Sequence, residues 1–176
     1  MKKLIIIFLS TFFLVSCSSV RVVTDYDSKT DFTKYKTFAF YKKGIDKAKI
    51  SDLDKRRILK AIESELLLKG YRKSDNPDML VSIFAKSRKK VYVDSGFDYP
   101  VSYWYPPYYF GRERLRVTKQ TEGTLFIDFI DVKNKKLVWQ GIGSGALGAR
   151  TGAKKVERIQ AFVKEIIANY PPGKEK

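Results

Sequence analysis

The side chains that most often carry enzyme chemistry are scarce in this chain. Among its 176 residues there is no histidine, and Cys17 is the only cysteine. Histidine is the commonest general base and metal ligand, while thiolates are typical ligands of zinc and copper. An enzyme built from this sequence would therefore depend on a carboxylate pair, for example Asp94 and Asp98. The composition predicts a protein that is not an enzyme and that holds no metal and no cofactor.

Cys17 lies where a thiol has a specific use. Two lysines precede an apolar run over residues 4–15, which suits the hydrophobic region of a signal peptide and is too short to span a bilayer comfortably. The tetrapeptide Leu14-Val15-Ser16-Cys17 resembles the lipobox of bacterial lipoproteins, in which the cysteine sulfur receives diacylglycerol. These features predict a signal peptide over residues 1–16, lipidation at Cys17 and a short tether over residues 17–19.

The same features predict where the mature protein is located. Acyl chains on Cys17 would attach it to a membrane without a spanning helix, because each buried CH₂ contributes about 0.8 kcal/mol. Ser18 follows the cysteine, whereas an Asp there would favour retention at the inner membrane of a Gram-negative bacterium. We therefore expect a lipid-anchored protein of the cell envelope, with the outer membrane of a Gram-negative bacterium favoured.

The net charge of the chain indicates which kinds of partner it could bind. The chain has 35 Lys and Arg against 19 Asp and Glu, a formal net charge of +16, and loss of Lys2 and Lys3 with the signal peptide leaves +14. An exported protein meets little nucleic acid, so we expect none as a partner. Anionic lipid headgroups, lipopolysaccharide, acidic glycans or an envelope protein fit this charge. The alternative is a lysine-rich solvated surface with no specific partner.

Residues 94–111 are dense in aromatic side chains and are interrupted by three prolines. Tyr and Trp rings can stack on sugars, lie at a lipid interface or anchor a protein partner, and basic residues flank the segment on both sides. The predicted binding surface comprises Tyr103, Trp104, Tyr105, Tyr108, Tyr109, Arg112 and Arg114. The alternative is a loop that folds back and covers the free face of a sheet.

Hydrophobic periodicity predicts the elements that position this segment. Strands are expected over residues 20–23, 35–41, 79–93, 112–130 and 137–141, with the aromatic segment as a long loop between the third and fourth. Helices are expected after Ser51, ending at Gly70, and over residues 153–168, and the polar residues after the second strand, through Lys49, are expected to form a loop. The core is expected to contain Phe38, Phe40, Leu80, Leu125, Ile127 and Trp139, and Asp78 and Asp131 are expected to cap turns. The order β-β-α-β-β-β-α predicts one α+β domain over residues 20–173, with a mostly antiparallel sheet and both helices packed on one face.

Residues 143–148 spell G-x-G-x-x-G after a predicted strand. The dinucleotide-binding interpretation requires a second parallel strand and an acidic residue about 20 positions later, and one helix is all that follows. We interpret these glycines as small residues where a strand and a helix approach each other.

Three groups of short motifs extend over nearly all of the mature chain. They are Val22-Val23-Thr24-Asp25-Tyr26-Asp27 with Asp31-Phe32 and Tyr35-Lys36-Thr37-Phe38-Ala39-Phe40; Lys69-Gly70-Tyr71 with Pro77-Asp78-Met79-Leu80-Val81; and Glu122-Gly123-Thr124-Leu125-Phe126-Ile127-Asp128 with Lys136-Leu137-Val138-Trp139-Gln140-Gly141. Together they resemble a family of bacterial lipoproteins whose domain has no assigned function. The resemblance implies no catalytic or binding residue. More distantly, the element order looks like small envelope lipoproteins that serve as assembly or transport accessories.

The expectation that follows is a membrane-anchored, non-enzymatic binding or assembly module. The alternative is a binder of cell-wall glycan or lipopolysaccharide that works through the aromatic segment and its basic flanks.

Overall fold

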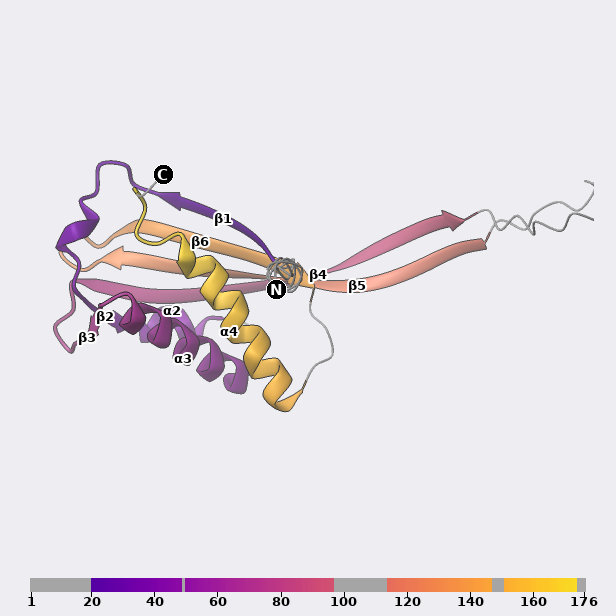
Figure 1. The fold of residues 1–176 in the computed structure, drawn as a ribbon, viewed down its shortest axis with the longest axis horizontal. Helices are drawn as coiled ribbons and strands as arrows, with labels where there is room; N and C mark the ends of the chain where they lie inside the picture. The colour runs from indigo at the N-terminus through magenta and orange to yellow at the C-terminus, as the bar shows by residue number, and fades with distance from the viewer. Residues whose placement is uncertain (1–19, 49, 97–113, 147–150, 174–176) are drawn as a thin grey trace, which may run out of the picture.

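The computed structural model describes residues 20–48, 50–96, 114–146 and 151–173. Within these residues, six strands form one sheet in the order β1-β6-β5-β4-β2-β3 (Figure 1). The strands are β1 (Arg21–Tyr26), β2 (Thr37–Phe40), β3 (Arg72–Lys73), β4 (Met79–Gly96), β5 (Arg114–Asp131) and β6 (Lys136–Ala146). The helical elements are the 3-10 turn η2 (Phe32–Lys34), α2 (Lys42–Asp46), α3 (Asp52–Leu68) and α4 (Gly152–Ala168).

The sheet is mostly antiparallel, as predicted, and the fold class is α+β. Antiparallel ladders join β1 to β6, β6 to β5 and β5 to β4, whereas β2 runs parallel to both β4 and β3. The first two strands of the chain are therefore not neighbours. β1 forms one edge beside β6, and β2 lies on the other side beside β4.

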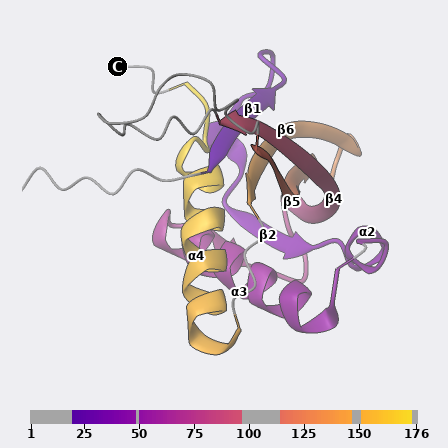
Figure 2. The same cartoon turned by 90° about the vertical axis from the view of Figure 1, so that its right-hand side faces the viewer.

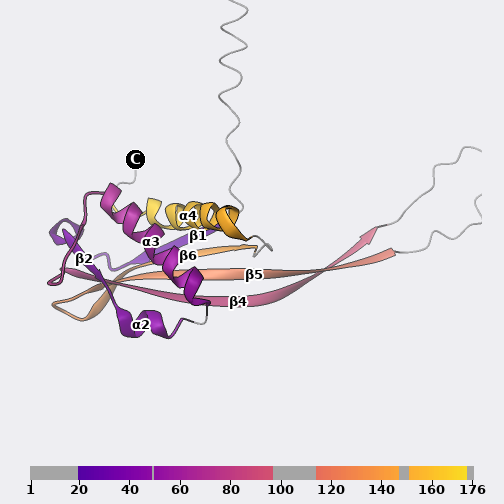
Figure 3. The same cartoon turned by 90° about the horizontal axis from the view of Figure 1, so that it is seen from below.

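The two long helices cover one face of the sheet and pack against each other, as Figures 2 and 3 show. In the first residues of β4 (79–83) and the last residues of β5 (125–129), odd-numbered side chains point into the layer between helices and sheet, so Val81, Ile127 and Phe129 are fully buried there. Trp139 from β6 and Ile166 from α4 complete this core without exposed surface. The short helix α2 lies on the opposite face, where Gly44 approaches the Ser82 side chain so closely that a Cβ atom would collide with its hydroxyl.

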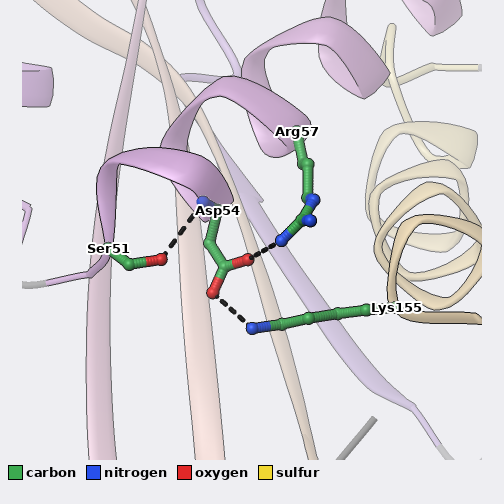
Figure 4. A network of polar contacts seen from close by, with 4 residues as sticks. All are labelled: Ser51, Asp54, Arg57 and Lys155. Carbon is green, nitrogen blue, oxygen red and sulfur yellow. Dashed lines mark hydrogen bonds and ion pairs between the residues drawn. The ribbon is translucent and has the colours of Figure 1, made fainter. Parts of the chain in front are cut away.

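A polar network ties the start of α3 to α4 (Figure 4). Ser51 is the N-cap of α3, and its hydroxyl accepts a hydrogen bond from the backbone N–H of Asp54 at 3.2 Å. The Asp54 carboxylate lies 2.8 Å from Arg57 on the same helix and 2.6 Å from Nζ of Lys155 on α4. Burial alone would raise the pKa of Asp54, but the hydrogen bonds from Lys155 and Arg57 outweigh it and lower that pKa.

Candidate functional site

The hairpin formed by β4 and β5 extends far beyond the rest of the sheet (Figure 1). Its two strands pair along their whole length, from Met79 opposite Asp131 to Gly96 opposite Arg114. On its two sides, however, β2 pairs with β4 only as far as Val81, and β6 pairs with β5 only as far as Glu122. We call residues 89–96 and 114–121 the ribbon. At about 3.3 Å per residue, these eight pairs project roughly 26 Å from the body.

Aromatic and charged side chains meet where the ribbon leaves the body. The ammonium group of Lys86 lies 5.5 Å from the ring centre of Phe84 and 5.7 Å from that of Phe126. Phe84 is 38% exposed, so these two cation–π contacts stand on the sheet face that α3 and α4 leave uncovered. Beside them, Arg88 forms an ion pair with Glu122 at 3.3 Å.

The start of β1 lies in the same row of the sheet as the base of the ribbon. Arg21 is opposite Ser144, Ser144 is opposite Thr124, and Thr124 is opposite Lys86. Cys17, the predicted lipidation site, precedes Arg21 by four residues, which span at most about 14 Å of extended chain. Cys17 itself lies outside the described residues.

Most of the predicted binding surface also lies outside the described residues. This holds for Tyr103, Trp104, Tyr105, Tyr108, Tyr109 and Arg112, and with them for the alternative that the loop covers the sheet. Arg114 opens β5 opposite Gly96, at the far end of the ribbon. Asp98, one member of the carboxylate pair that an enzyme would need, also lies outside the described residues.

The other end of the body holds a buried carboxylate that sequence reasoning placed only as a turn cap. Asp131 is 3% exposed and accepts hydrogen bonds from the Tyr35 hydroxyl at 2.7 Å and from the backbone N–H of Asn134 at 2.7 Å. Lys34 adds an ion pair at 3.3 Å. Burial alone would raise the pKa of Asp131, but these donors lower it to about 2.

A pocket of about 360 Å³ opens beside this carboxylate. Three separate segments line it: residues 32, 33, 35 and 36 around η2, residues 69–71 after α3 and residues 171–173 after α4. Sequence patterns did not indicate it, because its walls come from turns that are distant in the chain and adjacent only after folding.

Two further findings concern the described part of the chain alone. It contains no group of three or more His, Cys, Asp and Glu side chains arranged to hold a metal ion. None of its helices is long and apolar enough to cross a bilayer.

The arrangement defines a class: an α+β domain in which two helices cover one face of a six-stranded sheet and a two-stranded ribbon projects from one end. Residues 22–172 match a family described as a domain of unknown function (DUF4136), and the chain belongs to this family.

Comparison with known proteins gives the fold and little more. The chain is similar to a solved PDZ domain protein from Parabacteroides distasonis, at a TM-score of 0.55 and 18% identity. The match covers 95% of this chain and 40% of that protein, so this chain spans well under half of its length. Two structures of a PelC dodecamer from Paraburkholderia phytofirmans align at TM-scores of 0.43 and 0.47 with 13% identity, covering 85% of this chain and 95% of theirs. No curated protein matches.

Proposed function

We propose that this chain is a lipid-anchored protein of the cell envelope, located at the outer membrane, that acts as a non-enzymatic binding or assembly module. Its contact surface is the ribbon together with the aromatic segment that joins the ribbon strands. The observation that carries this proposal is that the ribbon projects from the body and that no other helix or strand of the described residues pairs with it.

The length of the hairpin supports a role in contact. β4 and β5 each have 18 residues, whereas strands in globular proteins usually have 3–10. Among the side chains that the structure describes, the buried hydrophobic residues of the hairpin that lie nearest the ribbon are Ile83 and Leu125. An isolated two-stranded hairpin is marginally stable in water, so the ribbon gains most by packing on another molecule.

The position of β1 supports an anchored orientation. Arg21 lies in the row of the sheet at the ribbon base, so a lipid on Cys17 would hold that end of the molecule near the membrane. Arg88, Lys89 and Lys90, which follow one another at the ribbon base, would then lie close to anionic headgroups, where each basic residue contributes about 1 kcal/mol to membrane attachment.

The lipid anchor is tested by metabolic labelling with an alkyne fatty acid. We expect label on the wild type and none on the Cys17→Ser variant, which should leave the membrane fraction. A labelled variant, or an unlabelled wild type in a strain that labels its other lipoproteins, would contradict the anchor.

The contact surface is tested by crosslinking in intact envelopes followed by purification. The variant changes Tyr103, Trp104, Tyr105, Tyr108 and Tyr109 to Ser. The matched control changes exposed apolar residues of the body to Ser, namely Tyr41, Leu53 and Leu68, which are 38%, 56% and 81% exposed. We expect the wild type and the control to be crosslinked to the same partners, and the aromatic variant to lose them.

A second function, binding of cell-wall glycan or lipopolysaccharide by the same surface, is favoured by one observation. Lys86 lies over Phe84 and Phe126, and aromatic rings beside cations suit sugars that carry phosphate or carboxylate. Retention of the purified protein on lipopolysaccharide or sacculi at physiological salt, lost in the aromatic variant, would assign this function. If the aromatic variant instead loses a crosslinked envelope protein and the purified wild type is not retained on lipopolysaccharide or sacculi, the first function, a binding or assembly module, would be assigned.

A further inference from the structure

We propose that the pocket at the end of the body opposite the ribbon binds a pyranose sugar that carries a carboxylate. The pocket lies beside the start of β2 and the C-terminal ends of α3 and α4, whereas the ribbon leaves the sheet at the other end. The two sites are separate, so this inference does not depend on the function proposed for the ribbon.

The walls of the pocket suit a sugar ring. Half of its ten lining residues are aromatic residues or prolines, namely Phe32, Tyr35, Tyr71, Pro171 and Pro172. Flat apolar side chains of this kind stack on the C–H faces of pyranose rings. The volume of about 360 Å³ lies in the lower range of pockets that bind small molecules.

The floor of the pocket is held in place before any ligand arrives. Tyr170 is 1% exposed and packs against Phe32 and Tyr71, with ring centres 5.9 and 5.6 Å away. Tyr35 is 2% exposed and its hydroxyl is fixed on Asp131. A ligand would therefore bind without the entropic cost of ordering these rings.

The charged side chains that line the pocket favour an acidic ligand. No carboxylate lines the pocket, whereas Lys36 and Lys69 do. Lys69 is partly engaged, since its ammonium group donates to the carbonyl of Ala168 at 3.5 Å. The ammonium group of Lys36 makes no hydrogen bond or ion pair with any side chain that the structure describes. Lys36 is thus the cation available to a ligand carboxylate.

Three carboxylates, those of Asp31, Asp78 and Asp131, lie near Lys36 without lining the pocket. Asp131 is buried and already accepts from Tyr35, Asn134 and Lys34. One carboxylate oxygen of Asp78 accepts three hydrogen bonds, from the backbone N–H of Lys36 and from the backbone N–H and hydroxyl of Thr37. The pKa of Asp31 is lowered by hydrogen bonds from Thr33 and by the charges of Lys34 and Lys36. None of these three carboxylates lines the pocket, so the charged groups that a bound ligand meets there are the ammonium groups of Lys36 and Lys69.

The test measures binding of two acidic saccharides to the full-length protein in detergent by ligand-observed NMR and calorimetry. One is an oligogalacturonate, which represents acidic polysaccharides. The other is a muramic acid-containing disaccharide, which represents the cell wall. Each is paired with the same saccharide after its carboxyl groups have been reduced to alcohols. Binding of either acid over its reduced form supports the proposal and names the source.

Two variants test whether the saccharide binds in the pocket. Lys36→Gln should weaken it about three- to tenfold, the range for one partly screened charge-assisted contact. Lys29→Gln removes the same charge from an exposed lysine outside the pocket and should leave affinity unchanged. Equal loss in both variants, equal binding of acid and reduced saccharide, or no binding of any saccharide at millimolar concentration would overturn the proposal. Thermal unfolding of both variants verifies that each is folded.

Discussion

The Tyr35 hydroxyl donates a 2.7 Å hydrogen bond to the carboxylate of Asp131 across 96 positions of the chain. Both residues are buried. The bond joins the segment before β2 to the last residue of β5, two strands that are separated in the sheet by β4. It therefore holds the end of the body where the pocket lies.

Replacing Tyr35 by Phe should lower the free energy of unfolding by about 2 kcal/mol, because a hydrogen bond to a buried charged group is lost. Urea unfolding at pH 7 measures the change. Tyr41→Phe is the matched control, since Tyr41 is 38% exposed, and it should stay within about 0.5 kcal/mol of wild type. Equal effects would show that the bond to Asp131 contributes nothing specific.

Acid should weaken the fold through Asp131. Its pKa is lowered from 3.8 to about 2 in the folded protein, so the folded state favours the charged form. The stability this provides, about 2 kcal/mol, is fully present above pH 4 and is lost as the pH falls through about 2. Comparing unfolding of wild type and Asp131→Asn between pH 2 and pH 7 tests this. The difference in free energy of unfolding between the two proteins should shrink toward low pH. A difference that stays constant with pH would refute this role of Asp131.

The contact between α3 and α4 should depend on Asp54 far more than on its neighbour Asp52. Asp54→Asn removes ion pairs to Arg57 and Lys155, and we expect a loss of about 1 kcal/mol. Asp52, whose side chain is 88% exposed and lies 3.7 Å from Lys55, provides the control Asp52→Asn. A double-mutant cycle of Asp54→Asn with Lys155→Gln should show coupling, and additive effects would mean that the bridge between the helices is not energetically formed.

Gly143 should tolerate no side chain while α4 is in place. A Cβ there would lie 2.5 Å from Cδ1 of Ile166, so Gly143→Ala should destabilise the protein by roughly 1–3 kcal/mol. Ile166→Val removes that Cδ1 atom and should restore part of the loss in the double variant. Chemical unfolding of wild type, the two single variants and the double variant gives the free energies for this double-mutant cycle. If Ile166→Val restores no stability to Gly143→Ala, the destabilisation does not come from contact with Ile166.

The body should fold without the ribbon. Replacing residues 89–121 by an Asn-Gly turn between Arg88 and Glu122 removes the ribbon and the aromatic segment but none of the buried core. We expect a cooperative unfolding transition within about 1 kcal/mol of wild type. A shortened chain that fails to fold would show that the ribbon contributes to the core, which would weaken its assignment as a contact surface.

The sequence predicted elements wherever a local signal was strong. Ser51 caps α3, and Gly70 adopts the positive φ of 89° expected where that helix ends. Alternation gave the buried positions Ile127 and Trp139 correctly. The interpretation of the glycine motif is confirmed at Gly143, which lies against Ile166 of α4.

The errors occurred where tertiary contacts decide the outcome. Leu80 was expected in the core, but its neighbours Met79 and Val81 occupy the helix-covered face and the strand period places Leu80 on the other. The polar stretch after β2 was expected to be a loop, yet it contains α2, in which a single buried residue, Ile45, gave no helical pattern. The partners of β1 and the pocket depend on distant segments, so no local signal predicts them.

The ribbon has a further consequence for how copies of this chain behave toward one another. Along residues 89–96 and 114–121 the outer backbone N–H and C=O groups of both strands have no neighbouring strand among those described, and such edges are templates for pairing between molecules. The sequence supplies Lys89, Lys90, Arg114, Arg116 and Lys119 within these residues, so pairing of two copies along these edges would bring like charges together. We expect the resulting repulsion to oppose such pairing, and salt that screens the charges to weaken this opposition.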